Sequence, residues 1–171
     1  MHQILSLRNG SGDNQHFKCG WQFKSIIELL GDHEAVLYQI PKEDRWNIFY
    51  TVASCGTGKR EFQSQSVIVF DIDHVEHEKK TSCIPTVCAC LGIQENATGV
   101  IDSGNGLHFI IALKTSITEA AFFRKNKRHY VALCEKINAA LISAGLSGKA
   151  DTAIFDSSRL MRMPGTVNKK K

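Results

Sequence analysis

The sequence of 171 residues lacks the two features that direct a protein into or across a membrane. It contains no run close to the roughly 18 uncharged apolar residues that a transmembrane helix needs. Residues 1–12 have neither the basic start nor the apolar stretch of a secretory signal peptide. We therefore expect a cytoplasmic protein without a membrane partner.

The sequence also lacks internal repeats, low-complexity linkers and the cysteine pattern of a disulfide scaffold. Four of its six cysteines lie inside apolar stretches, which is typical of free cysteines in a reducing compartment. Apolar residues make up 43% of the chain and charged residues 22%, as in an ordinary globular protein. The length fits one domain, which we predict over residues 1–171.

Excess positive charge is absent from most of the chain and gathers at its end. Ser157–Lys171 carries five basic residues and no acidic one, against a net charge of +4 for the whole chain. The remaining chain has 16 basic and 17 acidic residues and is therefore close to neutral. A basic edge on a neutral body indicates contact with a polyanion, and a solvated tail is the alternative.

Short apolar runs and helical periods alternate along the chain, which predicts an α+β fold with a mixed sheet. Residues 1–20 contain the turn-forming segment Gly10–Asn14 and are expected to be loop. The expected strands are Ala35–Ile40, Trp46–Ala53, Val67–Phe70, Thr98–Asp102, Leu107–Leu113 and Asp151–Phe155. The expected helices are Lys24–Leu30, Thr81–Leu91 and a long helix that begins at a Ser116/Glu119 capping box and ends at Gly145. The expected apolar face of the long helix consists of Tyr130, Val131, Leu133, Cys134, Ile137 and Leu141.

The strongest local signal is a pair of acids after the apolar run Val67–Phe70. Asp71 and Asp73 project to the same face of the strand, about 7 Å apart along the backbone, because side chains alternate. Two carboxylates this close repel each other, and one or two divalent cations resolve the repulsion. Paired ions of this kind also drive phosphoryl transfer. A strand end whose aspartate caps or turns the chain is the alternative.

Two further segments carry residues suited to phosphate. In Ser103-Gly104-Asn105-Gly106-Leu107-His108 the glycines permit a tight turn with outward N–H groups, and a plain hairpin connection is the alternative. Near the chain end, Asp151 and Asp156 precede two arginines that suit bidentate phosphate contacts, with surface ion pairs as the alternative. The basic and polar residues of that segment are Arg159, Arg162, Asn168 and Lys169.

Taken together, the three segments resemble the archaeo-eukaryotic primase superfamily, in its primase-polymerase branch from plasmids, phages and other mobile elements. The matching motifs are Asp71-Ile-Asp73, then Ser103-Gly-Asn-Gly-Leu-His108, then Asp151 with Arg159-Leu-Met-Arg162-Met-Pro-Gly-Thr-Val-Asn168-Lys169. They follow the family's order across about Val67–Lys169, and residues 1–30 add no specific support. Many family members continue into a helical bundle and a helicase, so we expect an excised domain or a small relative.

The resemblance implies an RNA-recognition-motif-like sheet flanked by helices, beside an N-terminal αβ part. It implies a nucleotidyltransferase, a DNA primase or DNA-directed polymerase, which replicates a mobile element by a two-metal mechanism. Its implied partners are a single-stranded DNA template, a primer, NTP or dNTP substrates, and a helicase in the same or another chain. Asp71, Asp73 and Asp151, or Asp156 in place of Asp151, would hold two Mg²⁺ or Mn²⁺ ions. The implied nucleotide-binding residues are Ser103, Gly104, Asn105, Gly106, His108, Arg159, Arg162, Asn168 and Lys169.

Two alternatives from other classes remain open. A replication initiator or nucleic-acid-binding domain could keep the fold without the activity. A two-metal nuclease also needs clustered carboxylates, although it does not need the turn before His108 or the arginine segment.

Overall fold

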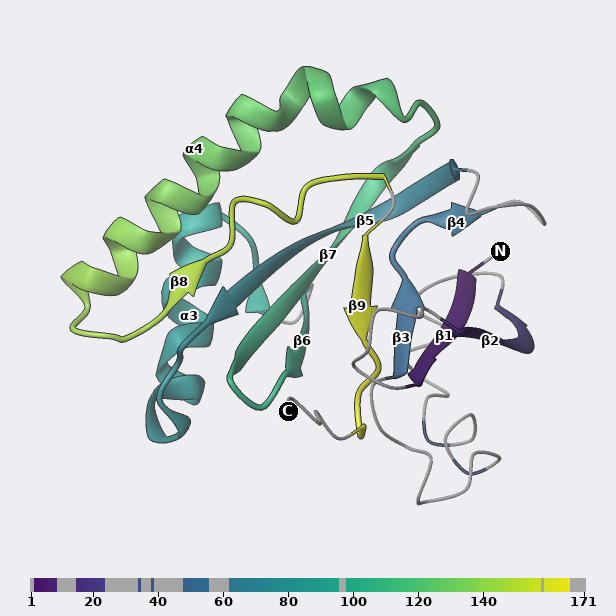
Figure 1. Cartoon of the computed structure of the whole chain (residues 1–171). Coiled ribbons are helices and arrows are strands. Elements are labelled where there is room, and N and C mark those ends of the chain that lie inside the picture. Colours follow the sequence, from purple (N-terminus) through teal and green to yellow (C-terminus); the bar gives the residue numbers. More distant parts are fainter. Residues whose placement is uncertain are drawn as a thin grey trace. The chain divides into compact units, whose positions relative to one another are not determined.

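The computed structural model describes residues 2–8, 15–23, 34, 38, 48–55, 62–95, 98–157 and 159–166 (Figure 1). The chain divides into two compact units. Unit 1 comprises Met1–Gln65 and Ser157–Lys171, and unit 2 comprises Ser66–Asp156. Two compact units can belong to one domain, so the single domain over residues 1–171 stays a prediction.

Unit 1 contains a four-stranded antiparallel sheet in the order β2-β1-β3-β9. Its strands are β1 (His2–Arg8), β2 (Gln15–Phe23), β3 (Ile48–Thr51) and β9 (Leu160–Arg162). The prediction of loop over residues 1–20 is therefore wrong for most of that segment. The turn-forming residues fall between β1 and β2, whose backbone groups satisfy each other by pairing.

Other predictions in unit 1 have mixed outcomes. β3 confirms the predicted strand Trp46–Ala53 over Ile48–Thr51, whereas Val52 and Ala53 form a bend before the short β4 (Ser54–Cys55). Of the strand expected over Ala35–Ile40 only Tyr38 is described, and it is helical, so the prediction is wrong there. The helix expected over Lys24–Leu30 lies outside the described residues.

Unit 2 holds most of a five-stranded sheet in the order β4-β5-β7-β6, in which β8 also pairs with β5, so that β8, β5, β7 and β6 follow one another within the unit. Two helices pack on this sheet. Its elements are β5 (Phe62–Asp73, which begins in unit 1), the 3₁₀ turn η2 (His77–Lys79), α3 (Lys80–Leu91), β6 (Thr98–Asp102), β7 (Gly106–Ile117), α4 (Ala121–Ser143) and β8 (Lys149–Ala150). This element order and strand order form a split βαβ arrangement. It confirms the predicted α+β class and the RNA-recognition-motif-like sheet.

The helices of unit 2 cover one face of its sheet, and the acids of β5 belong to the other face. Phe70 stacks on Tyr130 of α4 with ring centroids 5.0 Å apart. The side chains of Ile72 and of Leu141 on α4 both lie close to Gly148, at 3.2 Å and 3.5 Å from the position that a Cβ there would take. Because side chains alternate along a strand, Asp71 and Asp73 face away from α4.

Predicted element ends differ from the observed ones at two places. The capping box of Ser116 and Glu119 is wrong, because Ser116 belongs to β7 and α4 begins at Ala121 without a side-chain cap. The last strand is also wrong, since β8 ends at Ala150, before the predicted Asp151–Phe155.

α3, β6, β7 and the left-handed Gly145 after α4 are confirmed. The predicted apolar face of α4 is confirmed in part, because Tyr130, Cys134, Ile137 and Leu141 are buried, whereas Val131 is half-buried and Leu133 is 39% exposed. In the part of the chain that the structure describes, no helix has the length and apolar character to cross a bilayer.

Candidate active site

Asp71 and His108 lie together on neighbouring strands of unit 2. The start of β7 packs against the end of β5, so residues 37 positions apart in the sequence become adjacent. Asp71 Oδ1 is 3.5 Å from His108 Nε2, and their side chains are only 15% and 6% exposed. The two side chains form an ion pair when the imidazole is protonated, and low exposure strengthens such an interaction. The structure thus joins residues of the first and second motifs.

Asp151 lies opposite Asp71 across the β5–β8 pair. The register joins Ile72 to Ala150 and Asp73 to Lys149, and the next step brings Asp151 beside Asp71. The Asp151 N–H donates to the Asp71 carbonyl at 2.8 Å. Directly opposite residues in an antiparallel pair share one face of the sheet. The third motif therefore meets the first through backbone pairing.

The Asp151 backbone is further tied to the interior of unit 2. Its carbonyl lies 3.4 Å from the Tyr130 hydroxyl, which donates to Val69 O at 3.0 Å. Burial is the main cause of a raised Tyr130 pKa, so the hydroxyl keeps its proton and remains a donor. The Asp151 carboxylate accepts the Ala153 N–H at 2.7 Å, a local bond that turns the chain after β8.

Asp156, the substitute for Asp151, occupies a different position. It lies five residues beyond Asp151, and its N–H donates to the Ile154 carbonyl at 3.0 Å. The β5–β8 register does not extend to it. This geometry favours Asp151 as the third acid, which stays a prediction.

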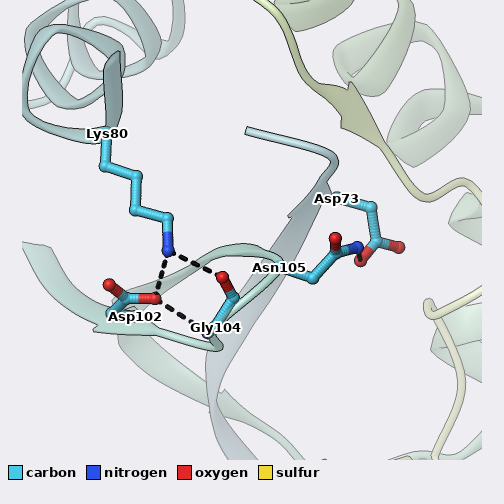
Figure 2. Close-up of polar contacts among 5 residues, drawn as sticks. All are labelled: Asp73, Lys80, Asp102, Gly104 and Asn105. Carbon is cyan, nitrogen blue, oxygen red and sulfur yellow. Dashed lines mark hydrogen bonds and ion pairs between the residues drawn. The ribbon is translucent and has the colours of Figure 1, made fainter. Parts of the chain in front are cut away.

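The glycine turn of the second motif packs on the end of β5 near Asp73 (Figure 2). The Asn105 amide donates to Asp73 Oδ1 at 3.4 Å, and the Asn105 carbonyl accepts from Val75 N–H at 3.1 Å. A Cβ on Gly106 would lie 1.9 Å from the Ile72 carbonyl oxygen. Glycine at position 106 is thus required for strand packing, whatever the turn binds.

Two backbone N–H groups of this turn do not point outward as expected. Ser103 N–H donates to the Gly106 carbonyl at 3.0 Å, which closes the hairpin. Gly104 N–H donates to Asp102 Oδ1 at 2.8 Å. The predicted cradle of outward N–H groups is therefore wrong at these two residues, because the turn satisfies them internally.

Sequence reasoning missed two residues beside this turn. Asp102 accepts both the Gly104 N–H and the Lys80 ammonium. Lys80 is buried on the first residue of α3. The position of Asp102 directly before the motif was an available signal, whereas the reach of Lys80 across 22 residues could not be found without the fold.

The donor atoms at this strand end suit a hard divalent cation, because carboxylate oxygens are the preferred ligands of Mg²⁺ and Mn²⁺. Among the described residues, however, no three His, Cys, Asp or Glu side chains gather into a ligand set. Asp73 and Asp151 currently accept hydrogen bonds from Asn105 and Ala153. Holding an ion would require these carboxylates to exchange those bonds for metal contacts.

The arginines of the third motif belong to unit 1, so their role toward the acids stays a prediction. Arg162 on β9 stacks over Phe49, with Cζ 5.6 Å from the ring centroid. Burial lowers the Arg162 pKa from its ordinary value. The Arg159 carbonyl accepts the Val52 N–H at 3.1 Å. Asn168 and Lys169 lie outside the described residues.

One solved structure that resembles the chain is the polymerase domain from Mycobacterium tuberculosis Ligase D in complex with DNA. The TM-score is 0.47 and the sequence identity 15%, over 72% of this chain and 48% of that one. The chain thus spans about half the length of that structure. No family model and no curated protein matches the chain.

Proposed function

We propose that this chain is the catalytic domain of a primase-polymerase, a DNA primase or DNA-directed polymerase that joins nucleotides on a single-stranded DNA template. Its metal would be Mg²⁺ or Mn²⁺, its substrates NTPs or dNTPs, and its setting the replication of a plasmid, phage or other mobile element. The three sequence motifs motivate this reading.

The observation that carries the proposal is the meeting of these motifs at one strand end. Asp71 contacts His108 and pairs through its backbone with Asp151, and these residues lie 37 and 80 positions away in the sequence. A purely structural strand end needs no such convergence of acids, imidazole and a glycine turn.

In this proposal Asp71, Asp73 and Asp151 would hold two divalent ions, and such ions would supply charge stabilisation and activation of the primer hydroxyl. His108 lies against Asp71, so its imidazole is held in place to donate to a phosphate of the incoming nucleotide. Asn105 beside Asp73 orients the turn toward the same phosphates. Arg159, Arg162 and Lys169 would offset phosphate charge on the substrate or the template.

The test is incorporation of labelled nucleotide on primed single-stranded DNA, with Mn²⁺ or Mg²⁺ supplied. We expect extension by the wild-type chain and none by Asp71→Asn. Glu76→Gln is the matched control, because Glu76 is an exposed acid that pairs with Lys79 at 3.0 Å outside the site. Extension at the wild-type rate by Asp71→Asn contradicts the proposal.

A non-catalytic initiator is the second candidate, favoured by one observation. The Asp73 and Asp151 carboxylates each accept a hydrogen bond within the protein, and the described residues contain no assembled ligand set. DNA binding without incorporation would support this candidate. Degradation of the labelled DNA without pyrophosphate release would instead identify a nuclease.

A further inference from the structure

An ion pair between the buried Lys80 and the half-exposed Asp102 lies beside the glycine turn of the second motif. Lys80, the first residue of α3, is 7% exposed. Its ammonium donates to Asp102 Oδ1 at 2.6 Å and to the Gly104 carbonyl at 2.9 Å (Figure 2). The hydrogen bond from Lys80 is the main reason that the Asp102 pKa lies below its ordinary value of 3.8. The Asp102 carboxylate is therefore ionised at neutral pH.

Local rules disfavour a lysine at this position. The amino end of a helix is partly positive, and an added cation there is destabilising. The first turn of α3 holds no acid, and the acid next to it is Glu78 in the 3₁₀ turn that precedes the helix. Burial of an ammonium adds a desolvation cost that only close partners offset. Sequences that break local rules in this way often do so at functional sites.

Its neighbour Lys79 shows the ordinary arrangement. Lys79 pairs with Glu76 at 3.0 Å, three residues earlier, and both side chains are roughly half exposed. Such surface pairs contribute little to stability. The two adjacent lysines thus differ in burial and in the distance along the chain to their partners.

Lys80 and Asp102 hold the Gly104 peptide groups from two directions. Asp102 accepts the Gly104 N–H at 2.8 Å, while Lys80 donates to the Gly104 carbonyl. Gly104 has a φ of 89°, and no heavy atom lies within 4 Å of the position that a Cβ would take. The Gly104 peptide is therefore held by its polar contacts to the ion pair, within a turn that the Ser103–Gly106 backbone bond closes.

The residues after Gly104 reach the proposed active site. Asn105 contacts Asp73 through its amide, and His108 contacts Asp71 two residues beyond the turn. A shift of the Gly104 peptide therefore moves the groups that would meet the triphosphate. We propose that Lys80, through Asp102 and Gly104, is a positioning residue for the incoming nucleotide. This inference rests on the proposed function.

The test is a steady-state comparison of nucleotide incorporation by Lys80→Met, Asp102→Asn and the matched control Lys79→Met. We expect KM for the nucleotide to rise about tenfold in the first two variants with little change in kcat, as for residues that orient a binding group. Lys79→Met should behave as wild type. Lys80→Arg keeps the charge and should recover part of the affinity.

Hydrogen exchange at the Gly104 amide provides a second readout. The amide should exchange faster in Lys80→Met and Asp102→Asn than in Lys79→Met, because the acceptor carboxylate is no longer held by Lys80 in the first variant and becomes a weaker amide oxygen in the second. If Lys80→Met fails to fold, Asp102→Asn carries the test, since Asp102 is half exposed.

The outcomes separate this inference from the proposed function. If the wild-type chain incorporates no nucleotide, the proposed function is contradicted. An active wild type with an unchanged KM in both Asp102→Asn and folded Lys80→Met overturns the inference alone. A fall in kcat at constant KM also overturns it, because loss of positioning must weaken nucleotide binding.

Discussion

The two halves of the candidate site are held in place by different means. Asp71 and Asp151 are placed by the β5–β8 register, a property of the backbone that survives side-chain changes. Gly104 and Asn105 are placed by polar contacts to Lys80, Asp102 and Asp73. Substitutions in the first half should remove chemistry and leave the fold, whereas substitutions around the second should move the turn. The predictions below test this distinction, from the largest expected effect to the smallest.

Asp71→Asn should lower nucleotide incorporation by about 1,000-fold or more, because a lost metal ligand costs several kcal/mol of transition-state stabilisation. The register of β5 with β8 should persist, so circular dichroism and thermal unfolding should stay close to wild type. Asp73→Asn should act in the same direction. If either variant loses activity because it unfolds, the claim that β5–β8 pairing survives changes of these side chains is contradicted.

Asp151→Asn and Asp156→Asn should differ sharply. We expect about 100-fold loss of incorporation for Asp151→Asn, since only Asp151 lies opposite Asp71. Asp156→Asn should stay within about twofold of wild type. Rates measured at equal Mn²⁺ concentration decide between them, and the reverse order would transfer the third-acid role to Asp156.

Gly106→Ala should destabilise unit 2, because its Cβ would lie 1.9 Å from the Ile72 carbonyl oxygen. Overpacking of this kind costs about 1–3 kcal/mol. For a chain of this length the melting temperature should fall by about 3–10 °C. Gly99→Ala on β6 is the control, because its Cβ would meet ordinary contacts at 3.6 Å or more. Equal melting temperatures for the two variants would contradict the close approach.

Asp102→Asn should change the dependence of stability on pH. The folded-state pKa of Asp102 is lowered, so its ionised form contributes stability above 3.8, and this contribution is lost as pH falls through the folded-state value. The difference in unfolding free energy between wild type and Asp102→Asn should therefore be constant above about pH 5 and shrink below pH 4. Urea titrations at pH 3 and pH 7 measure it. A gap of the same size at both values would mean that the ion pair does not act in the folded state.

Local patterns predicted the elements of unit 2 well. The run Val67–Phe70, the turn before His108 and the buried stripe of α4 each depend on residues close in sequence. Residues 1–20 gave no local signal of strands, because the turn-forming residues Gly10–Asn14 stand in the sequence between two strands that stabilise each other by pairing. Capping at Ser116 failed because β7 extends through Ile117 and delays the helix.

The site was predictable only in part, because local patterns do not reveal contacts between residues that are far apart in the sequence. The motifs named Asp71, His108 and Asp151, and the fold brings these residues together in pairs. The Lys80–Asp102 pair could not be inferred, because its partners come from α3 and the end of β6. The inward direction of the Gly104 N–H comes from a local bond to the Asp102 side chain two residues earlier, which the glycine pattern alone does not show.

The most direct test of the central claim is a crystal structure of the chain with Mn²⁺ and a nucleoside triphosphate, with anomalous scattering to locate manganese. Our account predicts manganese ligated by Asp71, Asp73 and Asp151, with the triphosphate near His108 and the Gly104–Asn105 turn. Manganese bound elsewhere, or a triphosphate remote from His108, would contradict it.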